Sequence, residues 1–124
     1  MDDIVFPYDD DPVAVYLHEI GQIAPLDTDE ETNCIQHIRA GDQEAESAAK
    51  RLMEAHLHLV VSIAERYCHK HGDMLDLLQR GNLGLMNAVR NLGSSHFDSF
   101  LNYATSAIER AIEETLGDSG LSVV

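Results

Sequence analysis

The segment Asp73–Val89, which reads DMLDLLQRGNLGLMNAV, holds the densest group of side chains that could bind another protein. Its apolar positions Leu75, Leu78, Leu85 and Val89 are expected to pack into a core. The polar side chains between them would then face outward, toward a partner. Asp76 and Arg80 are four residues apart, so a simpler role for this pair is an ion pair within the helix.

The segment Asp98–Leu116 carries a second group of polar side chains, and acids dominate it. Four of its residues lie three or four apart and so share one helix face: Asn102, Ser106, Glu109 and Glu113. This face is expected to be neutral to acidic. A phosphate backbone is repelled by such a surface unless a local basic patch exists.

The sequence shows no constellation typical of catalysis, neither a glycine-rich phosphate loop nor a Ser/His/Asp order that suggests a triad. Cys68, His69 and His71 cluster near one expected helix end, but neighbouring residues on a helix do not converge as metal ligands must. We therefore expect no catalytic residue, no metal and no cofactor, and the protein is expected not to be an enzyme. Cys34 and Cys68 are expected to be buried free thiols.

The composition is that of one acidic folded domain. The chain has 124 residues, of which 44 % are apolar, enough for a single core. Its net charge is −14, and the first 31 residues carry ten acids and no Lys or Arg. No apolar run is long enough to span a bilayer, so no membrane association is expected. The acidic N-terminus is unlike a secretory signal, which makes a cytoplasmic location the expectation.

Every strong periodic signal in the chain is helical, which predicts an all-α fold. A first helix is expected from Pro12, with Gly21 at its end. The stretch Thr28-Asp-Glu-Glu31 is typical of a capping box that opens a second helix, and Gly41 closes that helix. Asp42 is expected to cap the helix that follows.

The third helix is predicted to be the longest, over residues 43–71, with one apolar stripe facing a core. Gly81 and Gly84 then interrupt a helical pattern, where each glycine costs about 1 kcal/mol relative to alanine. They indicate either a break into two short helices or the close approach of a neighbour. The last helix is predicted over residues 98–116, ended by Gly117.

Four segments in this order resemble bacterial RNA polymerase sigma factors of the sigma-seventy type. They are DPVAVYLHEIG, LMEAHLHLVVSIAERY, LDLLQRGNLGLMNAV and FLNYATSAIERAI. Four motifs in the right order are highly specific, and they correspond to the family's regions one-two through two-four. The resemblance implies a compact helical bundle of about five to six helices, like sigma domain two, over residues 11–116. Residues 1–10 would be an acidic flexible lead and residues 117–124 a flexible tail.

In this family the segment Asp73–Val89 docks on the clamp coiled coil of the polymerase's largest subunit. Carried over by position, the polymerase-binding residues are Asp76, Leu77, Gln79, Arg80, Asn82 and Met86. Arg80 departs from the pattern, since the family commonly has an acid there. The resemblance implies core RNA polymerase as the partner, with an anti-sigma protein as another.

In the same family the last helix captures the unwound promoter strand. Aromatic side chains stack on flipped bases, each worth about 1–3 kcal/mol, and a Trp pair wedges the duplex fork. Phe100 and Tyr103 match the family, and Arg110 stands where the family has a Gln that reads the duplex edge. The Trp pair is replaced by Ser106 and Ala107. The resemblance therefore implies that DNA binding is weak or absent.

Three functions follow as hypotheses. The first is a sigma-like protein that binds polymerase core, or a sigma regulator, with weakened promoter reading. The second is a divergent working sigma factor, or a fragment of one, that binds the promoter −10 strand. The third is a partner-switching module unrelated to polymerase. Family members continue into further helical domains, and a single domain of this kind is not expected to select a promoter in the usual two-element way.

Overall fold

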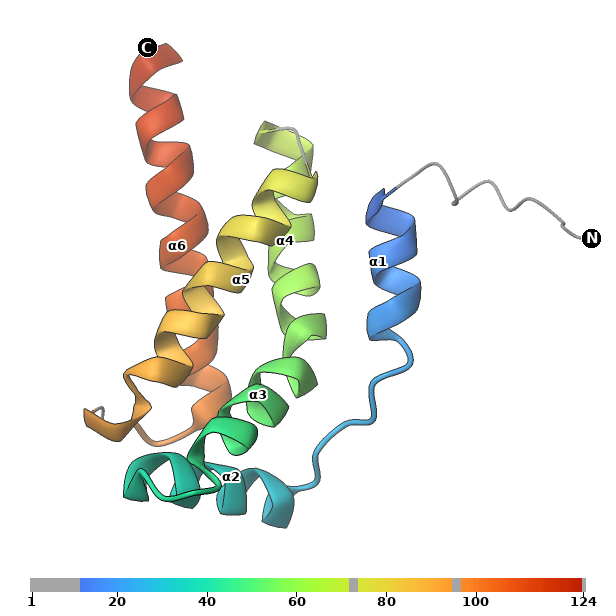
Figure 1. The fold of residues 1–124 in the computed structure, drawn as a ribbon. Helices are drawn as coiled ribbons and strands as arrows, with labels where there is room; N and C mark the ends of the chain where they lie inside the picture. The colour runs from blue at the N-terminus through green and yellow to red at the C-terminus, as the bar shows by residue number, and fades with distance from the viewer. Residues whose placement is uncertain (1–11, 72–73, 95–96, 124) are drawn as a thin grey trace, which may run out of the picture.

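The computed structural model describes residues 12–71, 74–94 and 97–123, and those residues form helices without a strand (Figure 1). The helices are α1 (Pro12–Ile20), α2 (Thr28–Ala40), α3 (Ala45–Ala55), α4 (Leu57–His71), α5 (Met74–Arg90), the short 3₁₀ helix η2 (Leu92–Ser94) and α6 (Phe100–Val123). The predicted all-α bundle is confirmed. The expected acidic lead of residues 1–10 lies outside the described residues. None of the described helices is both long and apolar enough to span a membrane.

Three helices, α4, α5 and α6, form the body of the bundle, with α5 running opposite to the other two (Figure 1). The helices α2 and α3 close one end, and α1 stands to one side. The most deeply buried side chains come from α3 through α6 and η2: Leu52, Val60, Ile63, Leu77, Leu78, Leu85, Leu92, Ile108 and Ile112. One apolar core therefore holds α5 and α6 against each other.

The helix α5 is continuous through Gly81 and Gly84. Both glycines lie where other helices come very close, which explains why neither position carries a side chain. A Cβ atom on Gly81 would lie 2.6 Å from Cγ1 of Val60 in α4. A Cβ atom on Gly84 would lie 2.7 Å from Cβ of Ala111 and 2.8 Å from the carbonyl oxygen of Ala107 in α6. The close-approach alternative is thus correct, and the break into two helices is wrong.

The capping box of α2 begins one residue earlier than predicted. Asp27 Oδ1 accepts the backbone N–H of Glu30 at 2.8 Å, and Glu30 Oε1 accepts the backbone N–H of Asp27 at 3.0 Å. Thr28 is instead the first helical residue. The helix closes as predicted at Gly41, whose φ of 63° is left-handed. A left-handed residue at this place is common because glycine adopts it without a Cβ clash.

Asp42 does not cap α3 directly. Its Oδ1 accepts the backbone N–H of Glu44 at 2.9 Å, so it stabilises the turn before the helix. The predicted long helix of residues 43–71 is also divided in two. His56 places its ring Nδ1 2.8 Å from the carbonyl oxygen of Leu52, while its own backbone N–H bonds to Met53 at 3.0 Å. The ring thus occupies the carbonyl of Leu52, which in a continuous helix would accept the backbone N–H of His56. The helix α3 therefore ends here, and α4 begins at Leu57.

The last helix begins at Phe100 and continues to Val123, past the predicted end at Leu116. Gly117 and Gly120 lie inside it. A helical glycine costs about 1 kcal/mol relative to alanine, which weakens a helix without forbidding it. The expectation of a flexible tail over residues 117–124 stays a prediction.

Candidate functional site

An exposed stripe runs along α5 on the side away from the core. Its members are Asp76, Gln79, Arg80, Leu83, Asn87 and Arg90, which we call the α5 face. Apart from the adjacent Gln79 and Arg80, neighbouring members are three or four residues apart, so all six share one side of the helix. Leu83 lies in the middle of this stripe with 46 % of its surface exposed. An apolar side chain ringed by polar ones is a common arrangement at protein interfaces.

The structure separates the six predicted polymerase-binding residues into three groups. Asp76, Gln79 and Arg80 are exposed on the α5 face, whereas Leu77 is only 1 % exposed and belongs to the core. Two others, Asn82 and Met86, are half-buried at the edge of the face. The Nδ2 atom of Asn82 donates to the hydroxyl of Tyr16 in α1 at 3.2 Å. In this conformation Leu77 is therefore unavailable to a partner.

The anticipated ion pair within α5 is present but loose. Arg80 Nε lies 3.9 Å from Asp76 Oδ1, and about half of each side chain is exposed. Such a pair within an exposed helix is worth about 0.3–0.5 kcal/mol. Both side chains therefore remain available for a partner at little cost.

Sequence reasoning overlooked Leu83. The signal was present, because a turn of 100° per residue places Leu83 near Asp76 and Arg80 and away from Leu78 and Leu85. A leucine within a leucine-rich segment is easily assigned to the core. Its departure from the apolar stripe is what marks it as a surface residue.

The two aromatic residues predicted to stack on DNA bases both make contacts within the fold. Phe100 is 3 % exposed, and its ring packs edge-on against His56 with 4.9 Å between centroids. Tyr103 is half-buried and stacks on Phe97 with 4.9 Å between centroids. Its hydroxyl donates to the carbonyl of Ala88 in α5 at 3.0 Å. Both rings therefore already pack against other aromatic side chains of the fold in this conformation.

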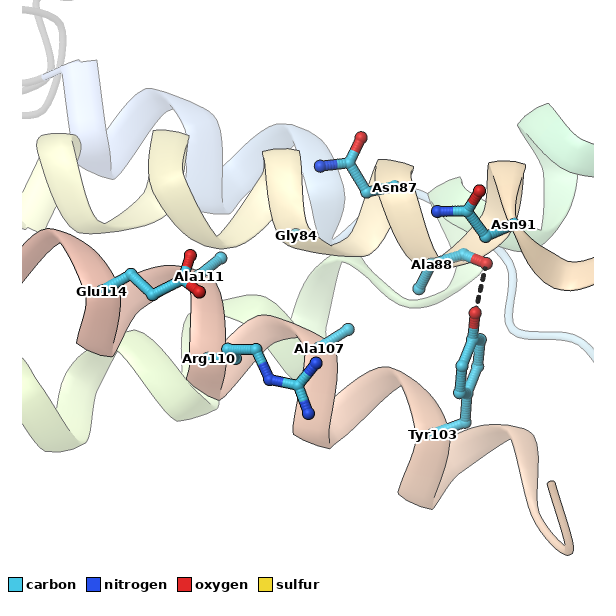
Figure 2. A pocket seen from close by; sticks show the side chains of 9 residues that line it. All are labelled: Gly84, Asn87, Ala88, Asn91, Tyr103, Ala107, Arg110, Ala111 and Glu114. Atoms are coloured by element: carbon cyan, nitrogen blue, oxygen red, sulfur yellow. Dashed lines mark hydrogen bonds between the residues drawn. The ribbon is translucent and has the colours of Figure 1, made fainter. Parts of the chain in front are cut away.

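Arg110, the third predicted DNA-binding residue, is exposed and lies at a groove between α5 and α6 (Figure 2). The groove has a volume of about 260 Å³. Its lining consists of Gly84, Asn87, Ala88, Asn91, Tyr103, Ala107, Arg110, Ala111 and Glu114. The small residues make room, and the amide, guanidinium and carboxylate groups offer hydrogen bonds. Of the three predicted residues, Tyr103 and Arg110 both line this groove, and Arg110 is the more exposed of the two.

The acids of α6 are used to hold α4. Glu109 Oε2 accepts Arg66 Nη2 at 2.9 Å, and Glu113 Oε2 accepts the hydroxyl of Tyr67 at 2.6 Å. The hydrogen bond to Glu113 and burial raise the pKa of Tyr67 to about 12. One basic side chain of α4, Arg66, is thereby paired with an acid. These contacts reduce the positive field that this side of the bundle offers to a nucleic acid.

The described residues contain no group of three His, Cys, Asp or Glu side chains placed to hold a metal ion. Cys34 and Cys68 form no disulfide, and Cys34 is buried beside a second cavity between α2 and α3. Cys68 is only half-buried, so the expectation that both thiols are buried is wrong for Cys68. Burial raises the pKa of the Cys34 thiol, which makes it a poor nucleophile near neutral pH. The side chains of His69 and His71 lie outside the described residues.

Comparison with known proteins places these features in one family. The model for Sigma-70 region 2 matches residues 52–120, and the model for Sigma-70 factor, region 1.2, matches residues 11–44. RNA polymerase sigma factor SigA of Lactococcus lactis subsp. cremoris is 44 % identical over 114 residues, which cover 92 % of this chain and 31 % of that protein. The same factor of Clostridium acetobutylicum is 44 % identical over 92 % of this chain and 29 % of its own length.

The factor of this name in Listeria monocytogenes is similar to the same extent, with 44 % identity over 91 % of this chain and 29 % of its own length. The chain therefore belongs to the sigma-70 family. It spans about a third of the length of the curated relatives that it matches. The match to regions 1.2 and 2 confirms the resemblance inferred from the four motifs.

Proposed function

We propose that this chain acts in transcription initiation as a sigma-factor-like protein that binds core RNA polymerase through the α5 face. Its relatives are named RNA polymerase sigma factors. The observation that carries the proposal is the exposed stripe of Asp76, Gln79, Arg80 and Leu83, which no other part of the described chain covers. The partner surface proposed for it is the clamp coiled coil of the largest subunit.

The chemistry of the α5 face suits a helical partner. The outer surface of a coiled coil carries charged side chains with long apolar stems, and an exposed helix can pack against it. Leu83 would supply the apolar contact, and fully burying a leucine is worth about 1.5–3 kcal/mol. Asp76, Gln79 and Arg80 would add hydrogen bonds at its margin and fix the register.

Binding to the isolated clamp coiled coil and to core polymerase tests the proposal. Asp76→Ala and Gln79→Ala are expected to weaken binding about three- to tenfold each, since each removes a polar contact worth about 0.5–1.5 kcal/mol. Gln36→Ala, an exposed change on α2, is the matched control and is expected to bind like the original chain. No binding, or equal binding by all of these variants, would contradict the proposal.

We further propose that promoter reading is weakened. The support is that Phe100 is buried, Tyr103 packs within the fold, and Glu109 pairs with Arg66. A divergent working sigma factor that binds the promoter −10 strand is the second candidate, and the exposed Arg110 beside the groove favours it. That candidate predicts salt-sensitive binding to single-stranded promoter DNA. It fails if polymerase with this chain neither opens a promoter nor protects the strand.

An anti-sigma protein is the other partner that the α5 face would fit, and a partner-switching module unrelated to polymerase is the third candidate. Co-migration with core polymerase, with and without promoter DNA, separates the three. Binding to core without DNA supports the first candidate. Binding to core that requires DNA, or that DNA strengthens, supports the second. If the chain does not bind core either with or without DNA, the third candidate remains.

A further inference from the structure

An incompletely bonded amide lies between α1 and α5. The Nδ2 atom of Asn82 donates to the hydroxyl of Tyr16 at 3.2 Å. The other polar atom of this amide, Oδ1, is buried, and no group in the described part of the chain donates to it. Turning the amide over does not help, because Tyr16 meets only one of its two ends. Buried side-chain polar atoms are nearly always bonded in folded proteins, so this atom calls for an explanation.

Asn82 stands at the edge of the α5 face. It is one turn after Gln79, beside Leu83 and one turn before Met86. A partner that covers Gln79 and Leu83 therefore comes within reach of the Asn82 side chain. The same amide thus serves α1 in the free chain and borders the surface where a partner would sit.

The attachment of α1 is uneven along its length. At its C-terminal end Ile20 is 2 % exposed, and in the segment that follows the carbonyl of Ala24 accepts Arg51 Nη2 at 2.9 Å. Toward its start, Val13 and Tyr16 are only half-buried against the core. Figure 1 shows α1 beside the bundle rather than within it. The C-terminal end of α1 is therefore more deeply buried than its start.

We infer that α1 and the polymerase partner compete for Asn82. In the free chain the amide is held by Tyr16, with its other end unbonded. When the partner covers the α5 face, Asn82 turns to it and bonds at both ends, and Tyr16 is released. The start of α1 then leaves the bundle while Ile20 keeps its end attached. This inference rests on the proposed function, because it requires polymerase on the α5 face.

Tyr16→Phe tests the competition, because it keeps the ring and removes only the hydroxyl. Its affinity for core polymerase is expected to rise about three- to tenfold, since one net hydrogen bond no longer opposes release of Asn82. Tyr67→Phe is the matched control, because it loses a hydrogen bond to Glu113 in α6, away from α1. The control is expected to bind with unchanged affinity.

Asn82→Ala is expected to bind core more weakly, and adding Tyr16→Phe to it is expected to change nothing further. Amide hydrogen exchange over residues 12–16 is expected to be faster in the polymerase-bound chain than in the free chain. Equal or weaker binding of Tyr16→Phe, or unchanged exchange, overturns the inference while the proposed function stands. If neither the original chain nor Tyr16→Phe binds core, both are overturned.

Discussion

At the scale of single residues, the α5 face centres on an apolar side chain that lies in an exposed position. Leu83 is apolar, yet it is 46 % exposed in the middle of a polar stripe. An isolated exposed leucine is ordinary by itself. Its place between Gln79 and Asn87 on one helix side is what makes it a candidate anchor, because hot spots lie near the centre of an interface.

Leu83→Ala is expected to weaken binding to core polymerase by about 1–2 kcal/mol, since it removes apolar surface that the partner would bury. The change is expected to leave the free energy of unfolding nearly unaltered, because the side chain is already exposed. Leu101→Ala is the matched control, with 51 % exposure at the start of α6. Titration of both variants against core checks the prediction, and equal loss in both would contradict it.

Gly84→Ala is expected to destabilise the fold by about 1–3 kcal/mol, because overpacking forces backbone to shift. The new Cβ would lie 2.8 Å from the carbonyl oxygen of Ala107, which is backbone and cannot rotate away. Gly93→Ala is the control, since nothing lies within 4 Å of its Cβ position. Urea unfolding of both variants measures the difference, and a Gly84→Ala chain as stable as the Gly93→Ala chain would contradict the expectation.

At the scale of elements, the sequence predicted the helices well and their junctions less well. Gly41 was identified as a helix end because only glycine adopts its backbone conformation easily. The division at His56 was not identified, because it depends on a ring nitrogen reaching the carbonyl of Leu52. Periodicity alone continues through such a site. The hydrogen bond of the Asn82 side chain to Tyr16 could not be predicted either, because it depends on where α1 lies in the fold.

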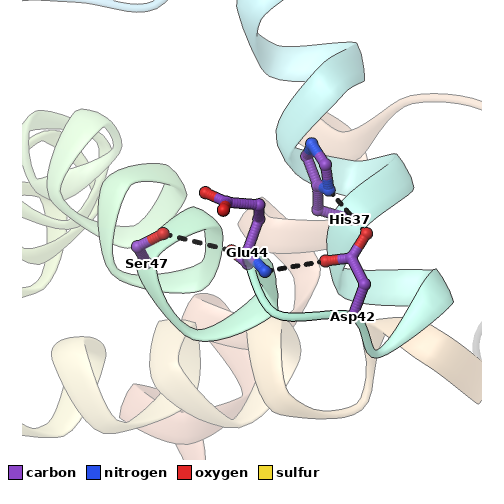
Figure 3. Close-up of polar contacts among 4 residues, drawn as sticks. All are labelled: His37, Asp42, Glu44 and Ser47. Carbon is purple, nitrogen blue, oxygen red and sulfur yellow. Dashed lines mark hydrogen bonds and ion pairs between the residues drawn. The ribbon is translucent and has the colours of Figure 1, made fainter.

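The turn between α2 and α3 provides a pH-dependent contribution (Figure 3). Asp42 Oδ2 lies 2.7 Å from His37 Nδ1, and this hydrogen bond lowers the pKa of Asp42 below its usual 3.8. Because the folded-state pKa is the lower one, the contribution is present above pH 3.8 and is lost as pH falls through the folded-state value. The stabilising form is therefore the carboxylate.

Asp42→Asn is accordingly expected to lower the free energy of unfolding at pH 6. Its deficit relative to the original chain is expected to shrink as pH falls below 3.8 toward pH 3, because the unfolded chain then takes up a proton that the folded carboxylate resists. Urea unfolding of both chains at the two pH values checks this. A deficit that is the same at pH 6 and pH 3 would show that the carboxylate charge contributes nothing.

At the scale of the whole molecule, net charge dominates the electrostatics. The chain carries −14, whereas the ion pairs of the described residues, such as Arg66 with Glu109 and Arg80 with Asp76, are largely exposed. Exposed pairs are worth about 0–1 kcal/mol each, and salt weakens them. Self-repulsion of a strongly acidic chain is also screened by salt, and screening there favours the compact state. The two effects have opposite signs, and we expect the relief of self-repulsion to outweigh the loss of the ion pairs.

The melting temperature is therefore expected to rise by several degrees when NaCl increases from about 10 to 150 mM, where the screening length falls to about 8 Å. Thermal unfolding followed by circular dichroism measures this shift. A melting temperature that falls with salt would show that ion pairs outweigh repulsion.

The groove beside Ala107 has an evolutionary consequence. The resemblance to the family implies that Ala107 stands where one tryptophan of the pair would be, and about 260 Å³ of space adjoins it between α5 and α6. The helices did not close over this position, even though Gly84 and Ala111 already bring their backbones close. A larger side chain could therefore return at residue 107 without a compensating change elsewhere. Regaining the pair that the family has would still take a second change, at the exposed Ser106.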